Sequence, residues 1–192
     1  MHGICDYWYE EYGMAASRID NDYVHKVVEN LAKENNVEYF INNFYMWETT
    51  ENDRTQLLPM LNSILKAKMD YVVIQLGENI SNSNCFESDY EELIKYIEKK
   101  CPKAKIISVG NFWENTEIDA IKEDVSVKRG ISYVSLDDSQ NDIRYSSKIG
   151  ESLFLSNGQI EEVTHEGVAN HPNDEGMKKI AIGILKALEK DN

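Results

Sequence analysis

The chain has 192 residues, of which 42% are apolar and 28% are charged, and its 34 acidic and 20 basic residues give a formal net charge of −14. This length and composition are typical of a single globular domain over residues 1–192. The acidic balance disfavours nucleic acid and anionic membrane surfaces as partners. No apolar run approaches the roughly 20 residues that cross a bilayer.

The sequence is typical of a cytoplasmic protein. Residues 1–13 lack the basic and apolar regions of a signal peptide. The cysteines at positions 5, 85 and 101 are widely spaced, odd in number and without metal-ligand spacing. We therefore expect reduced thiols, and neither a metal nor a cofactor.

Apolar periodicity predicts helices that alternate with short strands. In chain order we expect a helix at 20–34, a strand at 37–43, a helix at 57–65, a strand at 71–76, a helix at 88–100, a strand at 104–109, a helix at 118–125, a strand at 131–136, an irregular excursion at 137–170 and a last helix at 177–188. This order predicts an α/β fold, a three-layer α/β/α sandwich with a mostly parallel sheet.

Four local signals place helix ends and turns. A proline is tolerated in the first turn of a helix, and a serine followed three residues later by an acidic residue forms a capping box. An Asn-Gly pair favours a hairpin turn. The residues concerned are Pro59 in the second helix, Ser17 with Asp20 before the first, Ser88 with Glu91 at the start of the third, and Asn157 with Gly158 in the excursion.

The loop after the strand at 71–76 begins with Gly77, Glu78 and Asn79. In a parallel sheet, functional groups gather beyond the carboxyl ends of the strands. Glycine lets a backbone approach a ligand closely, and an asparagine amide can donate a hydrogen bond to a developing oxyanion. The same three residues also suit an ordinary turn.

His171 lies just before the last helix, followed by Pro172, Asn173 and Asp174. An imidazole titrates near neutrality, which suits a general base. Asn173 or Asp174 can cap the helix, so His171 would be held on a rigid element. The alternative is a surface histidine beside a helix cap.

Together these two motifs resemble those of the SGNH or GDSL-type hydrolases, a family of esterases and lipases. The resemblance implies a flavodoxin-like fold and hydrolysis of a small-molecule acyl or acetyl ester, including esters of carbohydrates. It implies His171 as the catalytic base, Asn79 as the oxyanion donor and Gly77 as the residue that shapes the loop. We expect the side chains of His171 and Asn79 to face one cleft, within roughly 10 Å of each other.

Three features depart from that family. The Gly-Asp-Ser nucleophile block does not occur in this chain, and Val168 stands where the usual acid would be. The glycine that would give a further oxyanion donor is absent from residues 43–45. Some relatives use a backbone carbonyl in place of the acid. Residues 13–25 resemble the region downstream of the nucleophile, which implies that the first strand is missing. The strands at 37–43 and 71–76 would then pair directly or leave a gap, unless residues 4–9 fill it.

The sequence therefore leaves alternative functions open. One is an ester hydrolase whose nucleophile is not found in this chain, with Ser17 the likeliest substitute by position. Another is a non-catalytic relative that binds a carbohydrate or acyl ligand, and a third is an unrelated flavodoxin-like module. Several aromatic side chains could stack on sugars or pack in the core. They are Tyr7, Trp8, Tyr9, Tyr12, Tyr45, Trp47 and Trp113.

Overall fold

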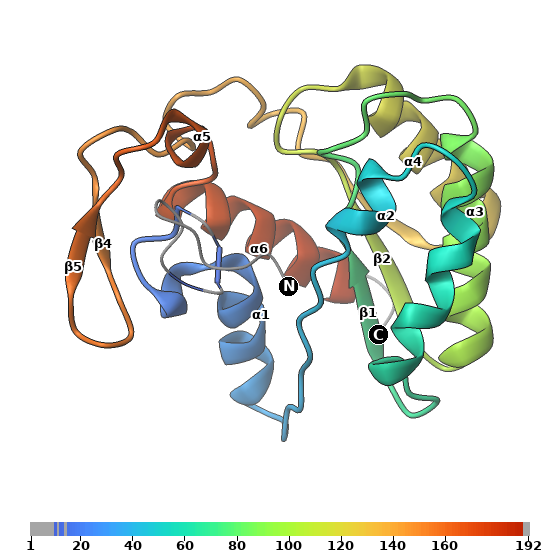
Figure 1. The fold of residues 1–192 in the computed structure, drawn as a ribbon. Helices are drawn as coiled ribbons and strands as arrows, with labels where there is room; N and C mark the ends of the chain where they lie inside the picture. Colours follow the sequence, from blue (N-terminus) through green and yellow to red (C-terminus); the bar gives the residue numbers. More distant parts are fainter. Residues whose placement is uncertain (1–9, 11, 14, 190–192) are drawn as a thin grey trace. The chain divides into compact units, whose positions relative to one another are not determined.

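The computed structural model describes residues 10, 12–13 and 15–189, and the chain divides into two compact units (Figure 1). One unit is formed by residues 1–41 together with 141–190, and the other by residues 42–140. The segment at 4–9, including the aromatic side chains at 7–9, lies outside the described residues.

The unit at 42–140 is an α/β unit around a three-stranded parallel sheet. Its strands lie in the order β1-β2-β3, and Val73, Ile107 and Ser132 are aligned across them. This confirms the α/β class and the parallel strands predicted at 71–76, 104–109 and 131–136. The elements are α2 (Tyr45–Thr49), the 3-10 helix η2 (Arg54–Ser63), β1 (Tyr71–Ile74), α3 (Phe86–Lys100), β2 (Lys105–Val109), α4 (Thr116–Arg129) and β3 (Ser132–Val134).

The core of this unit follows from the apolar stripe of α3. Side chains spaced three and four residues apart lie on one face of a helix, and burying that face supplies most of a helix's stability. The stripe packs against Ile74 of β1, Ile106 of β2 and Val125 of α4. Its members are Phe86, Tyr90, Leu93, Ile94 and Ile97.

The other unit pairs two helices and carries a small hairpin. Helix α1 packs against α6, and β4 pairs with β5 in antiparallel register, which confirms the predicted hairpin. The Asp174 carboxylate accepts hydrogen bonds from the Ser17 hydroxyl at 2.7 Å and from Asn21 Nδ2 at 2.8 Å. The elements are the 3-10 helix η1 (Ile19–Asn21), α1 (Tyr23–Ala32), β4 (Ser152–Phe154), β5 (Ile160–Glu162), α5 (Glu166–Ala169) and α6 (Asp174–Glu189).

The strand predicted at 37–43 does not form. Tyr39, Phe40 and Ile41 are 44–51% exposed. Aromatic and β-branched residues favour extended backbone, but a strand also needs a neighbour to complete its hydrogen bonds. Direct pairing of this segment with β1 is therefore wrong, and among the described residues β1 is an edge strand.

Three predicted helix starts are also wrong. Pro59 lies inside η2 and not in a first turn. This element is a 3-10 helix and not an α-helix. Helix α3 begins two residues before Ser88, whose hydroxyl donates to the carbonyl of Cys85. Ser17 does not cap α1, because Asp22 accepts from the backbone N–H of His25. In the two serine cases a competing hydrogen bond outweighs the local pattern.

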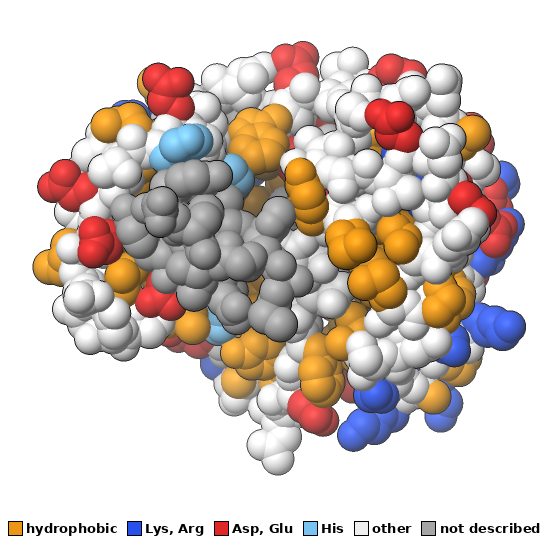
Figure 2. Space-filling view, in the orientation of Figure 1, with side chains coloured by type: hydrophobic (Ala, Val, Ile, Leu, Met, Phe, Trp, Pro, Cys, Tyr) orange, Lys and Arg blue, Asp and Glu red, His pale blue; other side chains and the backbone are white. Residues whose placement is uncertain are grey.

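Surface charge follows the helix dipole at the end of α3. The last turn of α3 carries Lys99 and Lys100, and basic side chains gather over this region (Figure 2). Cations are favourable near the partial negative charge of a helix C-terminus. No helix in the described part of the chain has the length and apolarity needed to cross a membrane.

Arg54 provides a test of the packing in this unit. Its side chain is 1% exposed, and Nη1 donates to Asp89 Oδ2 at 2.9 Å. Arg54→Ala leaves the Asp89 carboxylate buried without its partner, so we expect the free energy of unfolding to fall by about 3–5 kcal/mol in urea denaturation. Lys95→Ala removes the ion pairs that an exposed lysine makes with Glu91 and Glu92 and should change the free energy of unfolding little, because Glu91 keeps Lys128 as a partner. Equal effects of the two substitutions would contradict this account.

Candidate functional site

Gly77 follows β1 and has a backbone conformation that other residues avoid. Its φ is +128°, and a Cβ at this position would lie 2.6 Å from Asn111 Oδ1 and 3.0 Å from Ile118 Cγ2. Both the torsion and the space therefore require glycine. The loop backbone lies directly against Asn111, which follows β2, and against Ile118 and Lys122 of α4.

Glu48, on the short helix α2, holds this loop through three hydrogen bonds. Its Oε1 accepts from the backbone N–H of Gly77 at 2.6 Å and of Asn79 at 3.4 Å. Its Oε2 accepts from Asn79 Nδ2 at 2.9 Å. Glu48 is 6% exposed, whereas Asn79 is exposed. Sequence reasoning identified Gly77 and Asn79 but missed Glu48, because nothing in the local pattern around residue 48 indicates a buried acceptor.

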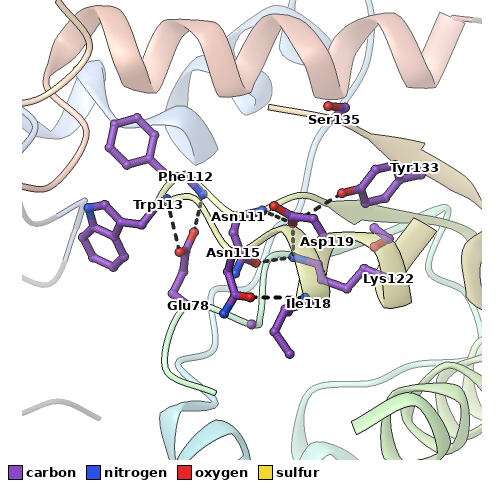
Figure 3. Close-up of polar contacts among 12 residues, drawn as sticks. Glu78, Asn111, Phe112, Trp113, Asn115, Ile118, Asp119, Lys122, Tyr133 and Ser135 are labelled. Carbon is purple, nitrogen blue, oxygen red and sulfur yellow. Dashed lines mark hydrogen bonds and ion pairs between the residues drawn. The ribbon is translucent and has the colours of Figure 1, made fainter. Parts of the chain in front are cut away.

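Glu78 points from the same loop to the next one (Figure 3). Its carboxylate accepts from the backbone N–H of Phe112 at 2.5 Å and of Trp113 at 3.4 Å. Burial raises the pKa of Glu78 to about 7, against the hydrogen bonds and the nearby Lys122, which lower it. Glu48 thus attaches the loop after β1 to α2, and Glu78 attaches the same loop to the loop after β2.

Lys122 is a fully buried cation beneath these loops. Nζ donates to Asn111 Oδ1 at 2.7 Å and lies 4.0 Å from Asp119 Oδ1 (Figure 3). Burial lowers the pKa of Lys122 to about 8, and Glu78 and Asp119 oppose that shift. Asp119 also accepts from the backbone N–H of Asn111 at 2.7 Å. The signal available in the sequence was the position of Lys122, four residues after Ile118 on the apolar face of α4.

In the other unit, His171 is half-buried just before α6. Nδ1 lies 2.5 Å from the carbonyl oxygen of Gly167. A carbonyl only accepts, so Nδ1 carries the proton, and in the neutral imidazole Nε2 holds the basic lone pair. Burial lowers the pKa of His171, while the Gly167 carbonyl opposes that shift. The net shift favours the neutral form of the ring.

Backbone and side-chain hydrogen bonds fix the segment around His171 and the start of α6. Asn173 Oδ1 accepts from the backbone N–H groups of Glu175 and Gly176, both at 3.0 Å, so Asn173 is the residue that caps α6. Val168 is buried and apolar, and its carbonyl accepts from the His171 backbone N–H at 2.9 Å. The backbone carbonyl that orients the imidazole is that of Gly167.

The remaining candidates divide between the two units. His171 lies in the unit that includes 141–190, and Gly77 and Asn79 lie in the unit at 42–140, so their meeting in one cleft stays a prediction. The Ser17 hydroxyl donates to a carboxylate, that of Asp174, and not to an imidazole. The described residues hold no cluster of His, Cys, Asp and Glu suited to a metal ion.

Among the aromatic candidates for sugar stacking, Trp47 is a core residue. It is completely buried, and its ring centroid lies 6.1 Å from that of Phe86 and 6.3 Å from that of Phe44. The large apolar area of an indole explains this position. A stacking role for Trp47 is therefore wrong. Tyr45, by contrast, is 38% exposed.

Comparison with known proteins adds one finding about the fold. No family model and no curated protein matches the chain. Among solved structures, the chain is similar to a protein from Chitinophaga pinensis described as a possible lipase, with 14% identity, a TM-score of 0.51 and 88% of each chain covered. The likeness shows a shared α/β fold.

Two glycines with positive φ separate torsional strain from steric clash. Gly130 has φ +66° and open space around its missing Cβ, whereas Gly77 has neighbours at 2.6 Å and 3.0 Å. We expect Gly130→Ala to lower the free energy of unfolding by about 1–2 kcal/mol through strain alone. Gly77→Ala should cost about 2–5 kcal/mol, because overpacking adds to the strain. Chemical denaturation of both variants measures the difference, and equal losses would show that the loop is not pressed against Asn111.

The raised pKa of Glu78 predicts a pH dependence of stability. Its carboxyl has an ordinary pKa of 4.5 and a folded pKa of about 7, so the folded state binds this proton more tightly. The stabilisation is complete below about pH 4.5 and is lost as the pH rises to about 7, a range in which Lys122 stays protonated. Glu78→Gln cannot lose a proton, and we expect its unfolding free energy to fall by about 2 kcal/mol less than that of the parent between about pH 5 and pH 7.

Urea denaturation at both pH values measures this difference. Glu92→Gln, which alters an exposed carboxylate, should retain the dependence of the parent. The same dependence in Glu78→Gln and in the parent would contradict the assignment.

Proposed function

We propose that the protein is an ester hydrolase of the SGNH or GDSL type that acts on acyl or acetyl esters, including esters of carbohydrates. The three-layer, flavodoxin-like sandwich belongs to this proposal. The observation that supports it most is the contact between His171 Nδ1 and the Gly167 carbonyl. That contact leaves Nε2 as the basic nitrogen of a neutral imidazole, which a general base needs.

The proposed reaction assigns a role to each sequence-predicted residue. A hydroxyl nucleophile attacks the ester carbonyl while its proton passes to His171 Nε2, and the carbonyl π electrons move to the oxygen. The Asn79 amide donates to that oxyanion, on a loop that Gly77 shapes. When the intermediate collapses, the imidazolium returns its proton to the leaving alkoxide. Water then releases the acyl group by the same steps.

The nucleophile is the part of this reaction that the 192 residues do not supply. They contain no Gly-Asp-Ser, and the hydroxyl of Ser17 donates to Asp174 at 2.7 Å. The same observation favours a second candidate function, a non-catalytic relative that binds an acyl or carbohydrate ligand. Genomic DNA upstream of Met1 distinguishes the two, because an in-frame Gly-Asp-Ser after an apolar strand favours the hydrolase.

The activity of the chain tests the proposal directly. We expect the 192 residues alone to hydrolyse short acyl esters barely above the uncatalysed rate, because a missing serine nucleophile removes on the order of 10⁶-fold of the acceleration. A protein that also carries an upstream Gly-Asp-Ser segment should hydrolyse such esters and react with a fluorophosphonate probe.

Two histidine variants of that longer protein assign the base. His171→Ala should abolish hydrolysis and labelling, whereas His25→Gln, on α1, should retain both. Strong labelling of Ser17 in the 192-residue chain would show that the nucleophile is misplaced. A longer protein with the serine but without esterase activity would contradict the hydrolase proposal.

A further inference from the structure

Glu48 is a buried carboxylate whose polar contacts are confined to one loop. Three N–H groups donate to it, two from the backbone of Gly77 and Asn79 and one from the Asn79 side chain. No Lys or Arg among the described residues lies within ion-pair distance of Glu48. A buried charge without an ion pair is expensive, and hydrogen bonds are what makes it tolerable.

A glutamine at position 48 would satisfy the two backbone donors equally well. Its amide oxygen could accept from the N–H groups of Gly77 and Asn79, without the cost of a buried charge. The difference lies at the second oxygen. In glutamine that position is an NH₂ group, which would face the NH₂ of Asn79, donor against donor. Only a carboxylate accepts hydrogen bonds at both ends of the group.

The carboxylate therefore determines which way the Asn79 amide points. Because Glu48 Oε2 accepts at 2.9 Å, the NH₂ end of Asn79 must face it and the carbonyl end must face away. An amide nitrogen has two hydrogens, so one is anchored on Glu48 and the second is available to another acceptor. Asn79 is exposed, so an oxygen from outside the protein can reach that second hydrogen.

We infer that Glu48 is a positioning residue, which holds the Asn79 amide with a donor N–H directed at the carbonyl oxygen of an ester. This role rests on the proposed hydrolase function. A carboxylate on α2 can fill this role and a glutamine cannot. The acid acts through Asn79 and does not touch the substrate.

The first measurement uses the 192-residue chain and its Asn79 side-chain signal. In a ¹⁵N-labelled sample, with the signal assigned by Asn79→Asp, one of the two amide protons should be shifted downfield and exchange with water on the order of 10-fold more slowly than the other. Glu48→Gln should remove both properties, because the amide turns over, while the Gly77 N–H keeps its acceptor. Glu92→Gln should leave the signal unchanged.

The parent spectrum decides this arm even if Glu48→Gln does not fold. Two equivalent, rapidly exchanging protons on Asn79 in the parent would overturn the inference. An unchanged Asn79 signal in a folded Glu48→Gln variant would overturn it as well.

The second measurement is kinetic and applies where the gene encodes an in-frame Gly-Asp-Ser upstream of Met1, in the protein that includes it. Glu48→Gln should lower kcat for a short acyl ester by about 10- to 100-fold with little change in KM, since a misplaced donor weakens transition-state binding. Combined with Asn79→Ala it should cause no further loss, because both changes remove the same hydrogen bond. Additive losses would show that Glu48 acts independently of Asn79 and would overturn the inference alone. A parent without activity would overturn the proposed function, and the catalytic role of Glu48 with it.

Discussion

The contact between the Gly77 backbone and the side chains of Asn111 and Lys122 constrains the whole loop edge of the parallel sheet. A Cβ on residue 77 would lie 2.6 Å from Asn111 Oδ1 and 3.3 Å from Lys122 Nζ. The loop therefore has no freedom to move toward α4. Glu48 is its second support, through the N–H groups of Gly77 and Asn79. The loop conformation follows from these two supports and from the φ that only glycine adopts easily.

The charges around this loop are costly, and their arrangement shows how the cost is offset. Lys122 is fully buried, and burial lowers its pKa to about 8. Burial also raises the pKa of Glu78, to about 7. Each group remains acceptable because it has hydrogen-bond partners: Asn111 for the lysine, and the backbone of Phe112 and Trp113 for the glutamate. Removing either side chain would leave its own buried partners unsatisfied: the Phe112 and Trp113 N–H groups for Glu78, and the Asn111 side-chain oxygen for Lys122. Such a network adds less to stability than apolar packing of equal volume, but it defines one loop geometry.

The sequence predicted the elements that bury long apolar stripes and missed those that depend on partners. The helix that became α3 and the strands at 71–76 and 104–109 follow from periodicity, because burial at regular spacing leaves a local pattern. The strand predicted at 37–43 failed because a local pattern cannot provide a neighbouring strand. The caps at Ser17 and Ser88 failed because Asp22 and Cys85 offered competing hydrogen bonds. Among the candidate residues, Gly77, Asn79 and His171 stood in recognisable runs, whereas Glu48 and Lys122 reach the loop after β1 from elements distant in sequence.

One histidine and one asparagine side chain illustrate a common physical principle in this fold. His171 has one nitrogen fixed by the Gly167 carbonyl, and Asn79 has one N–H fixed by Glu48. In each, a polar group with two equivalent-looking ends is given a definite orientation by a partner that can only accept. A carbonyl selects the protonated nitrogen of the imidazole, and a carboxylate selects the NH₂ end of the amide. In the proposed reaction, the remaining nitrogen of His171 is the base and the remaining N–H of Asn79 is the donor. In the proposed hydrolase, orientation by an acceptor lets the Gly167 carbonyl serve where Val168 offers no acid, and lets Glu48 act through Asn79 without touching a ligand.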